Sequence, residues 1–255
     1  MPPLCLHMSI AYEAAGLLHS PTIDRHRGSY FIGATSPDVH IIASTRREDT
    51  HFFGLDDESP QSCAGLLATH PHLAAVDKLD AATRSFVAGY FSHLTTDEVW
   101  IMDVYRPCFG TASPLGGASM ANMLDRALQF ELDRREREDR EKMRAIRDAI
   151  AGWEPSPSID LVEPDIMREW RDFIITATTR EPVWDIFRLF AERFLLSRHK
   201  LDADELEGFL DAMPAPLEWA IQYVTAERLD TFRRRSVAQS VERAREYLGE
   251  DSERT

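Results

Sequence analysis

The sequence predicts an all-α protein: a multi-helix bundle that encloses a metal site and continues into a helical C-terminal extension. Apolar residues recur at three- and four-residue spacing along most of the chain, which is the period of an amphipathic helix. No alternating run of apolar and polar residues exceeds about four positions, near the lower limit for a β-strand. Proline and glycine fall between the helical segments, as in "PLGG", "EPSPS" and "MPAP".

The helical period defines the predicted elements in chain order. The segment 80–105 is amphipathic and rich in aromatic residues to bury, and 118–152 carries mixed-sign charges that are typical of a solvated face. Tryptophans 153, 170, 184 and 219 fall within helical patterns, which predicts that they belong to the core. The full set of predicted helices is 9–18, 80–105, 118–152, 164–179, 182–199, 202–213 and 216–248.

The proline-rich stretch "EPSPS" is the best candidate boundary within the chain. It divides a helical domain, residues 1–153, from a helical C-terminal extension, residues 154–255, that is predicted to pack on that domain. The extension also offers helices through which copies of the chain could form a homo-oligomer.

The overall charge limits the classes of partner. The net charge of −14, from 43 acidic and 29 basic residues, repels phosphate backbones and anionic membrane surfaces, so we expect no nucleic-acid partner. A phosphate-bearing substrate would need a local cationic centre. Three cysteines without a disulfide pattern predict a reducing, cytoplasmic location. The N-terminus lacks the basic region of a signal peptide, and no run of eighteen apolar residues could span a membrane.

Histidine is distributed unevenly, which predicts a histidine-using site in the N-terminal part. Eight of the nine histidines lie within the first 93 residues, and only His199 follows. Taken alone, each candidate has an ordinary structural explanation: His7 as a polar residue before the first helix, and Asp38 in "SPDVH" as a helix N-cap. His93 and Asp97, however, are four positions apart, which places both on one face of a helix.

Imidazole nitrogens and carboxylate oxygens together are the ligands that zinc prefers. His93 and Asp97 can approach one ion, Asp38 and His51 can complete it, and Asp97 can bridge to a second ion held by His7. Aromatic residues around them would form a dry shell that orients the ligands. One turn before the histidine, "VAGYFSH" contains a glycine, Gly89, which predicts that another backbone comes close there.

These segments resemble the zinc-dependent phospholipase C family, whose superfamily also contains zinc-dependent single-strand nucleases. The similarity rests on an N-terminal histidine followed in order by "GATSPD", "THFF" and "GYFSHLTTDEVW", and it covers roughly residues 5–105. The resemblance implies an α-helical bundle that holds up to three zinc ions. It also implies that one ion is bound by Asp38, His51, His93 and Asp97, and a second by His7 with Asp97 as the bridge.

The chain also departs from the family pattern. Secreted members use the free N-terminus of the mature chain as a ligand, whereas six residues precede His7 here. Where those members have a further histidine, this chain has Asp103, and no histidine lies between positions 93 and 199 to form a later site. The later site is therefore either absent or carboxylate-based, with Asp103 as a ligand joined by Asp125 or Glu131 on the next helix. The expected cofactor is one to three zinc ions or other divalent metals.

The resulting hypothesis is a metal-dependent hydrolase of phosphoester bonds that uses metal-activated water, with Asp38 as the catalytic residue that orients this water. Its substrate would be a small-molecule phosphoester or a related compound. The alternative is a non-catalytic helical scaffold or partner-binding protein with a structural or degenerate metal site. The His-Asp helical phosphohydrolases require an adjacent His-Asp dipeptide, which this sequence lacks.

Overall fold

The computed structural model describes residues 3–43, 45–54, 57, 59–156, 159, 161–180, 187 and 203–250. Every secondary-structure element among these residues is a helix, which confirms the all-α prediction. Within the same residues, no helix combines the length and the apolar character that crossing a membrane would require.

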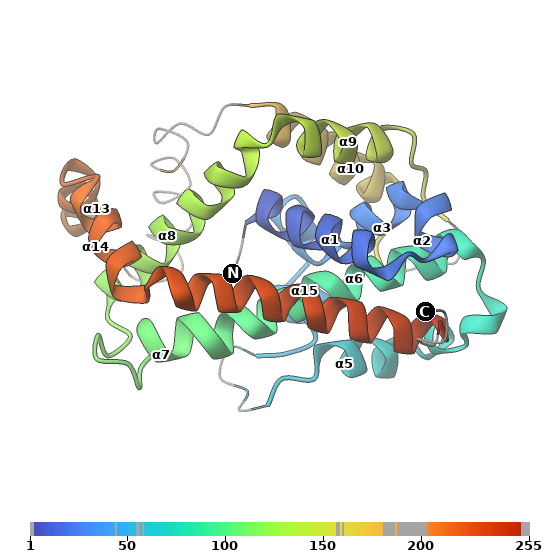
Figure 1. Ribbon diagram of the computed structural model, residues 1–255, viewed down its shortest axis with the longest axis horizontal. Coiled ribbons are helices and arrows are strands. Elements are labelled where there is room, and N and C mark those ends of the chain that lie inside the picture. The colour runs from blue at the N-terminus through green and yellow to red at the C-terminus, as the bar shows by residue number, and fades with distance from the viewer. Residues whose placement is uncertain are drawn as a thin grey trace.

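The helix α6 (Ala81–Trp100) forms the centre of the bundle. The long helix α15 (Ala226–Leu248) runs beside it, α3 (Arg27–Gly33) crosses it, and α1 (Leu4–Leu18) contacts both α6 and α15 (Figure 1). Almost every residue of α6 from Thr83 onward is buried as a result. Segments far apart in the sequence thus enclose the middle of α6.

A second group of helices lies across the first. It consists of α8 (Ser119–Glu138), α9 (Arg140–Ala151) and α10 (Pro164–Thr179), with α9 packed on α3 and α10 packed on α9 (Figure 1). The helix α14 (Ala215–Val224) packs against α8 and follows α13 (Ala203–Asp211).

Short helices connect these long ones. The connecting elements are α2 (Pro21–Arg25), η1 (Ser36–Ile41), α4 (Arg47–His51), α5 (Ser62–Thr69), η2 (Pro71–Ala74), η3 (Val76–Lys78), the π-helical turn η4 (Ile101–Tyr105) and α7 (Arg106–Cys108).

Two predicted helices are each broken by a residue that caps the second half. Asp139 separates α8 from α9, and its carboxylate accepts a hydrogen bond from the Lys142 amide at 3.0 Å. Thr225, with φ of 71°, separates α14 from α15, and its hydroxyl accepts from the Arg228 amide at 3.3 Å. Capping satisfies amides that a continuous helix would otherwise pair. The predicted helix 182–199 lies outside the described residues apart from Phe187.

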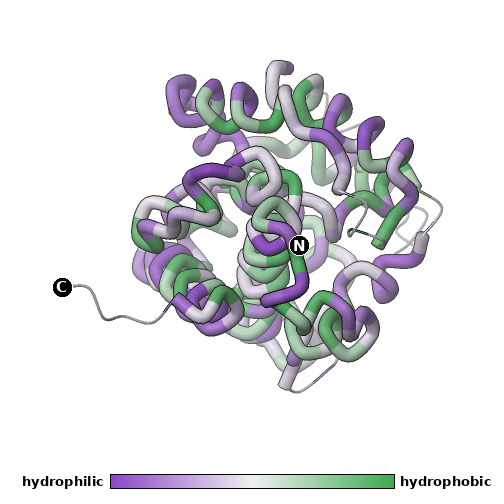
Figure 2. The backbone as a smooth tube through the Cα atoms, turned by 90° about the vertical axis from the view of Figure 1, so that its right-hand side faces the viewer, coloured by the Kyte–Doolittle hydropathy of each residue, from purple (hydrophilic) through white to green (hydrophobic). Residues whose placement is uncertain are grey.

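The core follows the amphipathic pattern with one correction. Hydrophilic and hydrophobic residues alternate along the helical turns, as amphipathic helices require (Figure 2). Trp153 and Trp170 are buried as predicted, whereas Trp219 is 44% exposed and stacks on Tyr223. A tryptophan in a helical pattern can thus lie on the outer edge of the apolar stripe, where a neighbouring ring covers one of its faces.

Candidate metal centre

The middle of α6 carries two of the candidate ligands. The helix begins after Asp80, whose carboxylate accepts a hydrogen bond from the Thr83 amide at 2.8 Å and so caps the N-terminus. His93 and Asp97 follow in the buried part, one turn apart, with 3.6 Å between His93 Nε2 and Asp97 Oδ2. The two side chains therefore share one face of α6 and approach each other inside the bundle.

Two glycines allow α3 and α6 to cross at close range. A Cβ atom on Gly89 would lie 1.9 Å from the carbonyl oxygen of Tyr30, and one on Gly33 would lie 2.0 Å from that of Phe86. Both separations are far shorter than van der Waals contact, so only glycine fits at either position. The prediction that another backbone approaches α6 at Gly89 is confirmed.

Backbone carbonyl groups determine which nitrogen of two histidines faces the centre. Nδ1 of His93 lies 3.0 Å from the carbonyl oxygen of Ala34, at the end of α3, and Nδ1 of His51 lies 3.1 Å from that of Arg47. Because a carbonyl oxygen only accepts, both Nδ1 atoms carry the hydrogen and donate it. In the neutral ring, Nε2 is then left with a free lone pair. Histidines that bind metals are usually held in this way.

Asp38 and His51 come from two short elements that α6 holds in place. Asp38 lies in η1, directly after Pro37, and does not cap an α-helix. His51 is the last residue of α4, and this helix is fastened to α6 by the Tyr90 hydroxyl, which donates to the carbonyl oxygen of Thr50 at 2.6 Å. Asp38 Oδ1 and His51 Nε2 are 3.6 Å apart.

His7 enters the cluster from α1. The sequence predicted that His7 precedes the first helix. The helix begins at Leu4, however, so His7 lies inside it. Its ring stacks on that of His93, with 3.7 Å between centroids and 8° between planes, and its Nε2 lies 3.3 Å from Asp97 Oδ1. Among the described residues, neither nitrogen of His7 and neither carboxylate oxygen of Asp97 has a hydrogen-bond partner.

The donor atoms are spaced as ligands of one tetrahedral ion would be. His51 Nε2 lies 3.4 Å from His93 Nε2 and 3.3 Å from Asp97 Oδ2. Zinc–ligand bonds of about 2.0–2.1 Å in a tetrahedron place neighbouring ligand atoms about 3.3–3.4 Å apart. Two further separations are both 3.6 Å, one from His93 Nε2 to Asp97 Oδ2 and one from Asp38 Oδ1 to His51 Nε2. These spacings and the unpaired buried atoms of Asp97 fit a zinc ion held by His51, His93 and Asp97. His7, Asp38 and His93 form a second set of three candidate ligands beside it.

The electrostatics of the cluster follow from burial and from mutual contact. Burial alone would raise the pKa of Asp97, but His93, His51 and His7 outweigh it and hold this pKa well below the usual range. Burial alone would lower the pKa of His93, but Asp38 and Asp97 outweigh it and raise this pKa. For His7, burial and the neighbouring His93 dominate and lower the pKa. The carboxylates therefore stay ionised and favour a cation between them and the rings.

Arg47 is a member of the cluster that the sequence did not reveal. It begins α4, one turn before His51, and its Nη2 lies 3.6 Å from Asp97 Oδ2. Its guanidinium lies over the ring of Phe53, with 4.9 Å from Cζ to the ring centroid. The spacing of four in "REDTH" was the available signal, because it places Arg47 and His51 on the same face of a short helix.

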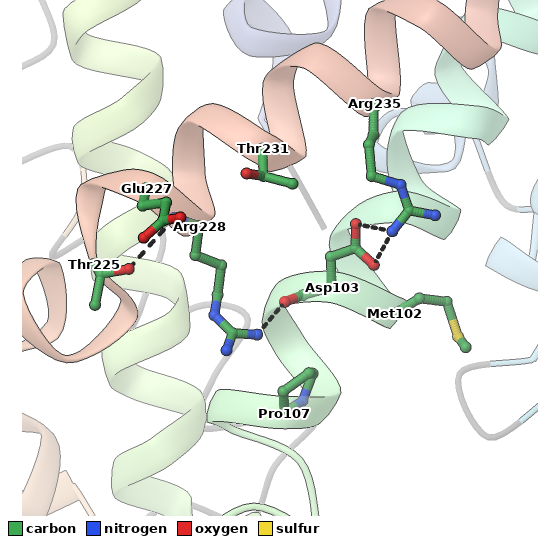
Figure 3. A pocket seen from close by; sticks show the side chains of 8 residues that line it. All are labelled: Met102, Asp103, Pro107, Thr225, Glu227, Arg228, Thr231 and Arg235. Carbon is green, nitrogen blue, oxygen red and sulfur yellow. Dashed lines mark hydrogen bonds and ion pairs between the residues drawn. The ribbon is translucent and has the colours of Figure 1, made fainter.

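The structure does not bring Asp103 to this cluster. Asp103 lies in η4, and both of its carboxylate oxygens accept from Nη1 of Arg235, at 2.7 and 2.6 Å, while its carbonyl oxygen accepts from Arg228 (Figure 3). These residues line an open hollow of about 490 Å³ at the start of α15. Two further carboxylates on α8 also have other partners. Asp125 accepts from Trp100 Nε1 and Gln129, and Glu131 accepts from Arg134 and Arg135.

Comparison of the chain with protein-family models, with curated proteins and with solved structures finds no match. The functional proposals therefore depend on the residues and on their geometry.

Proposed function

We propose that this chain is a zinc-dependent hydrolase of phosphoester bonds, similar to the zinc-dependent phospholipase C family. The observation that carries the proposal is a buried cluster in which acceptors face acceptors. The Nε2 lone pairs of His51 and His93 face the carboxylate oxygens of Asp97 and Asp38 at 3.3–3.6 Å, with Nδ1 occupied by backbone carbonyls. Acceptors at such distances repel one another unless a proton or a metal ion lies between them, and the ligand types suit zinc.

The residues of the cluster would have separate roles in metal binding and in orientation of the attacking water. When bound, zinc polarises a phosphoryl oxygen and generates a nucleophile from water at neutral pH. His51, His93 and Asp97 hold the ion, and α3 and α4 fix both rings through their carbonyl groups. Asp38 orients the attacking water by accepting a hydrogen bond. Burial would raise the pKa of Asp38, but His93 and His51 outweigh it and lower this pKa, so the carboxylate stays ionised and acceptor-only.

The accessible side of the cluster favours a small substrate. The side chains of His7, His51, His93 and Asp97 are at most 1% exposed, whereas those of Asp38 and Arg47 are 14% and 13% exposed. A substrate would therefore meet the ion from the side of Asp38 and Arg47. This narrow access suits a compact phosphoester better than a phospholipid that remains within a bilayer.

Metal content and turnover in matched variants test the proposal. The His93→Ala/Asp97→Ala double variant should lose zinc, measured by mass spectrometry, together with hydrolysis of aryl phosphodiesters and phosphomonoesters. The control His72→Ala/Asp77→Ala removes the same residue types from exposed positions and should keep both properties. Chelation should abolish turnover and added zinc should restore it. Turnover that survives both chelation and the His93→Ala/Asp97→Ala change would contradict the proposal.

One observation favours a second candidate, a non-catalytic helical scaffold with a structural metal. The ligand set His51, His93 and Asp97 is fully buried, and Asp38 lies 3.6 Å from His51, where it could close the site. Structural zinc sites are closed, whereas catalytic sites keep an open position. In that case zinc would raise the melting temperature of the protein without producing turnover. Zinc binding by the wild type together with inactivity toward both ester classes would support the scaffold.

A further inference from the structure

Arg47 is placed to act on whatever the ion binds. Its carbonyl oxygen accepts from Nδ1 of His51 at 3.1 Å, so its backbone orients a ligand, while its guanidinium reaches the carboxylate of Asp97. Phe53 supports one face of the guanidinium, at 4.9 Å from Cζ to the ring centroid. Nη1 also donates to the carbonyl oxygen of Phe53 at 3.4 Å. The planar group is thus held beside the metal ligands by contacts on several sides.

The charges of the ion, the carboxylates and Arg47 together favour an anion as the ligand of this arginine. The carboxylates of Asp38 and Asp97 balance one divalent ion, so the ion and these two carboxylates together are neutral. Arg47 adds one positive charge to this neutral set, in a chain whose net charge is −14. A partly exposed guanidinium beside a charge-neutral metal site attracts an anion, and its planar fork matches phosphate oxygens.

We propose that Arg47 binds the phosphate group of the substrate together with the ion. This inference rests on the proposed function and adds a residue to it. Arg47 and Asp38 are the cluster members with exposed surface, so a phosphate that approaches the ion passes the guanidinium. Two oxygens of the phosphate would pair with the guanidinium, which leaves the phosphorus between the ion and Asp38. The proposed substrate class is therefore a phosphoester with two free anionic or polar oxygens on phosphorus.

The same charges predict that phosphate and zinc bind cooperatively. Without the ion, the two carboxylates offset the charge of Arg47, so the cluster has no net positive charge to attract phosphate. With the ion the sum is one positive charge. Phosphate should therefore bind only to the zinc-loaded protein, and by reciprocity it should tighten zinc binding by the same factor.

Binding of inorganic phosphate to the full chain tests the inference without reliance on turnover. Titration calorimetry would compare zinc-loaded and chelator-treated wild type, Arg47→Met, Arg47→Lys and the control Arg46→Met. Arg46 is the neighbouring residue, is 77% exposed and pairs with Asp49, so Arg46→Met removes the same charge outside the cluster. We expect phosphate affinity to fall at least tenfold in Arg47→Met, to fall less in Arg47→Lys and to stay within twofold of wild type in Arg46→Met.

Zinc content, measured on each variant first, separates this inference from the proposed function. Equal phosphate affinity in Arg47→Met and Arg46→Met would overturn the role of Arg47, even if the wild type hydrolyses phosphoesters. Loss of zinc in both Arg47→Met and Arg47→Lys would show that Arg47 stabilises the zinc site. That result would also overturn the proposed phosphate-binding role. Zinc-dependent phosphate binding that requires Arg47, without turnover of any phosphoester, would support the inference and contradict the proposed hydrolase.

Discussion

The close crossing of α3 and α6 predicts a large effect of a small substitution, Gly89→Ala. The added methyl group would lie 1.9 Å from the carbonyl oxygen of Tyr30 and 3.0 Å from the amide nitrogen of Ala34. An ordinary carbon–oxygen contact is about 3.3 Å, so α3 must retreat by about 1.4 Å. A gap of this size removes more than half of the dispersion energy between atoms that were in contact.

Two terms decide the expected change in stability. Overpacking of a core costs about 1–3 kcal/mol, and a clash between two helix backbones belongs at the upper end of that range. Alanine restores about 1 kcal/mol because it is a better helix former than glycine. The free energy of unfolding of Gly89→Ala should therefore fall by about 2 kcal/mol. The retreat of α3 also withdraws the Ala34 carbonyl from His93, so zinc affinity should fall as well.

Urea unfolding followed by circular dichroism measures the first effect, and competition with a zinc chelator measures the second. Gly16→Ala is the matched control, because Gly16 lies in α1 with no atom within 4 Å of the added methyl group. The control should be neutral or up to about 1 kcal/mol more stable than wild type. If Gly89→Ala proves as stable as Gly16→Ala and binds zinc equally well, the proposed crossing geometry is refuted.

Three further perturbations have defined outcomes. Arg243→Met removes the guanidinium 2.7 Å from Oε2 of the buried Glu98, while Ser62 still donates to Oε1, and should lower the free energy of unfolding in urea by about 2 kcal/mol. Arg235→Met, at a half-exposed pair, should lower it by less than about 1 kcal/mol, and equal costs would contradict this. Burial would raise the pKa of Glu136, but the hydrogen bond from Arg233 outweighs it and lowers this pKa. The resulting stability is present above the unfolded pKa of about 4.3 and is lost as pH falls through the folded pKa. The difference in free energy of unfolding between wild type and Glu136→Gln should therefore narrow below about pH 4.3. A difference that widens there would contradict the assignment. Free zinc at about 100 times its Kd should stabilise the fold by about 2.7 kcal/mol and raise the Tm by about 5–11 °C in calorimetry, and an unchanged Tm would count against a metal centre.

The sequence was sufficient for the fold class because helical periodicity is a local property. It was insufficient for helix ends that depend on a single cap. Asp139 and Thr225 each stop one helix and start the next, but aspartate and threonine also occur within helices without breaking them. The crossing at Gly89 could be anticipated, since a glycine in the interior of a helix costs stability and is explained by a close backbone.

The grouping of the candidate site residues was predictable only where spacing along one helix decides it. His93 and Asp97 share a face of α6 because four residues make about one turn. Asp103 comes six residues after Asp97, in the π-helical turn η4 that follows α6, and its carboxylate meets Arg235 on α15. Arg47 was missed because its approach to Asp97 depends on how α4 packs against α6, which local pattern does not encode.

The helix α6 carries an ionised carboxylate, Asp97, among apolar core residues, and the cost of burying this charge explains the residues around it. An ionised carboxylate in an apolar interior is costly unless it is paired. Asp97 is fully buried, and its partners are imidazole nitrogens whose hydrogens point elsewhere, together with a single guanidinium at 3.6 Å. Without the ion, one ring must take up a proton at Nε2 to make this arrangement tolerable, which is why the pKa of His93 is raised. In the proposed zinc site, proton and metal would then compete for the same lone pairs.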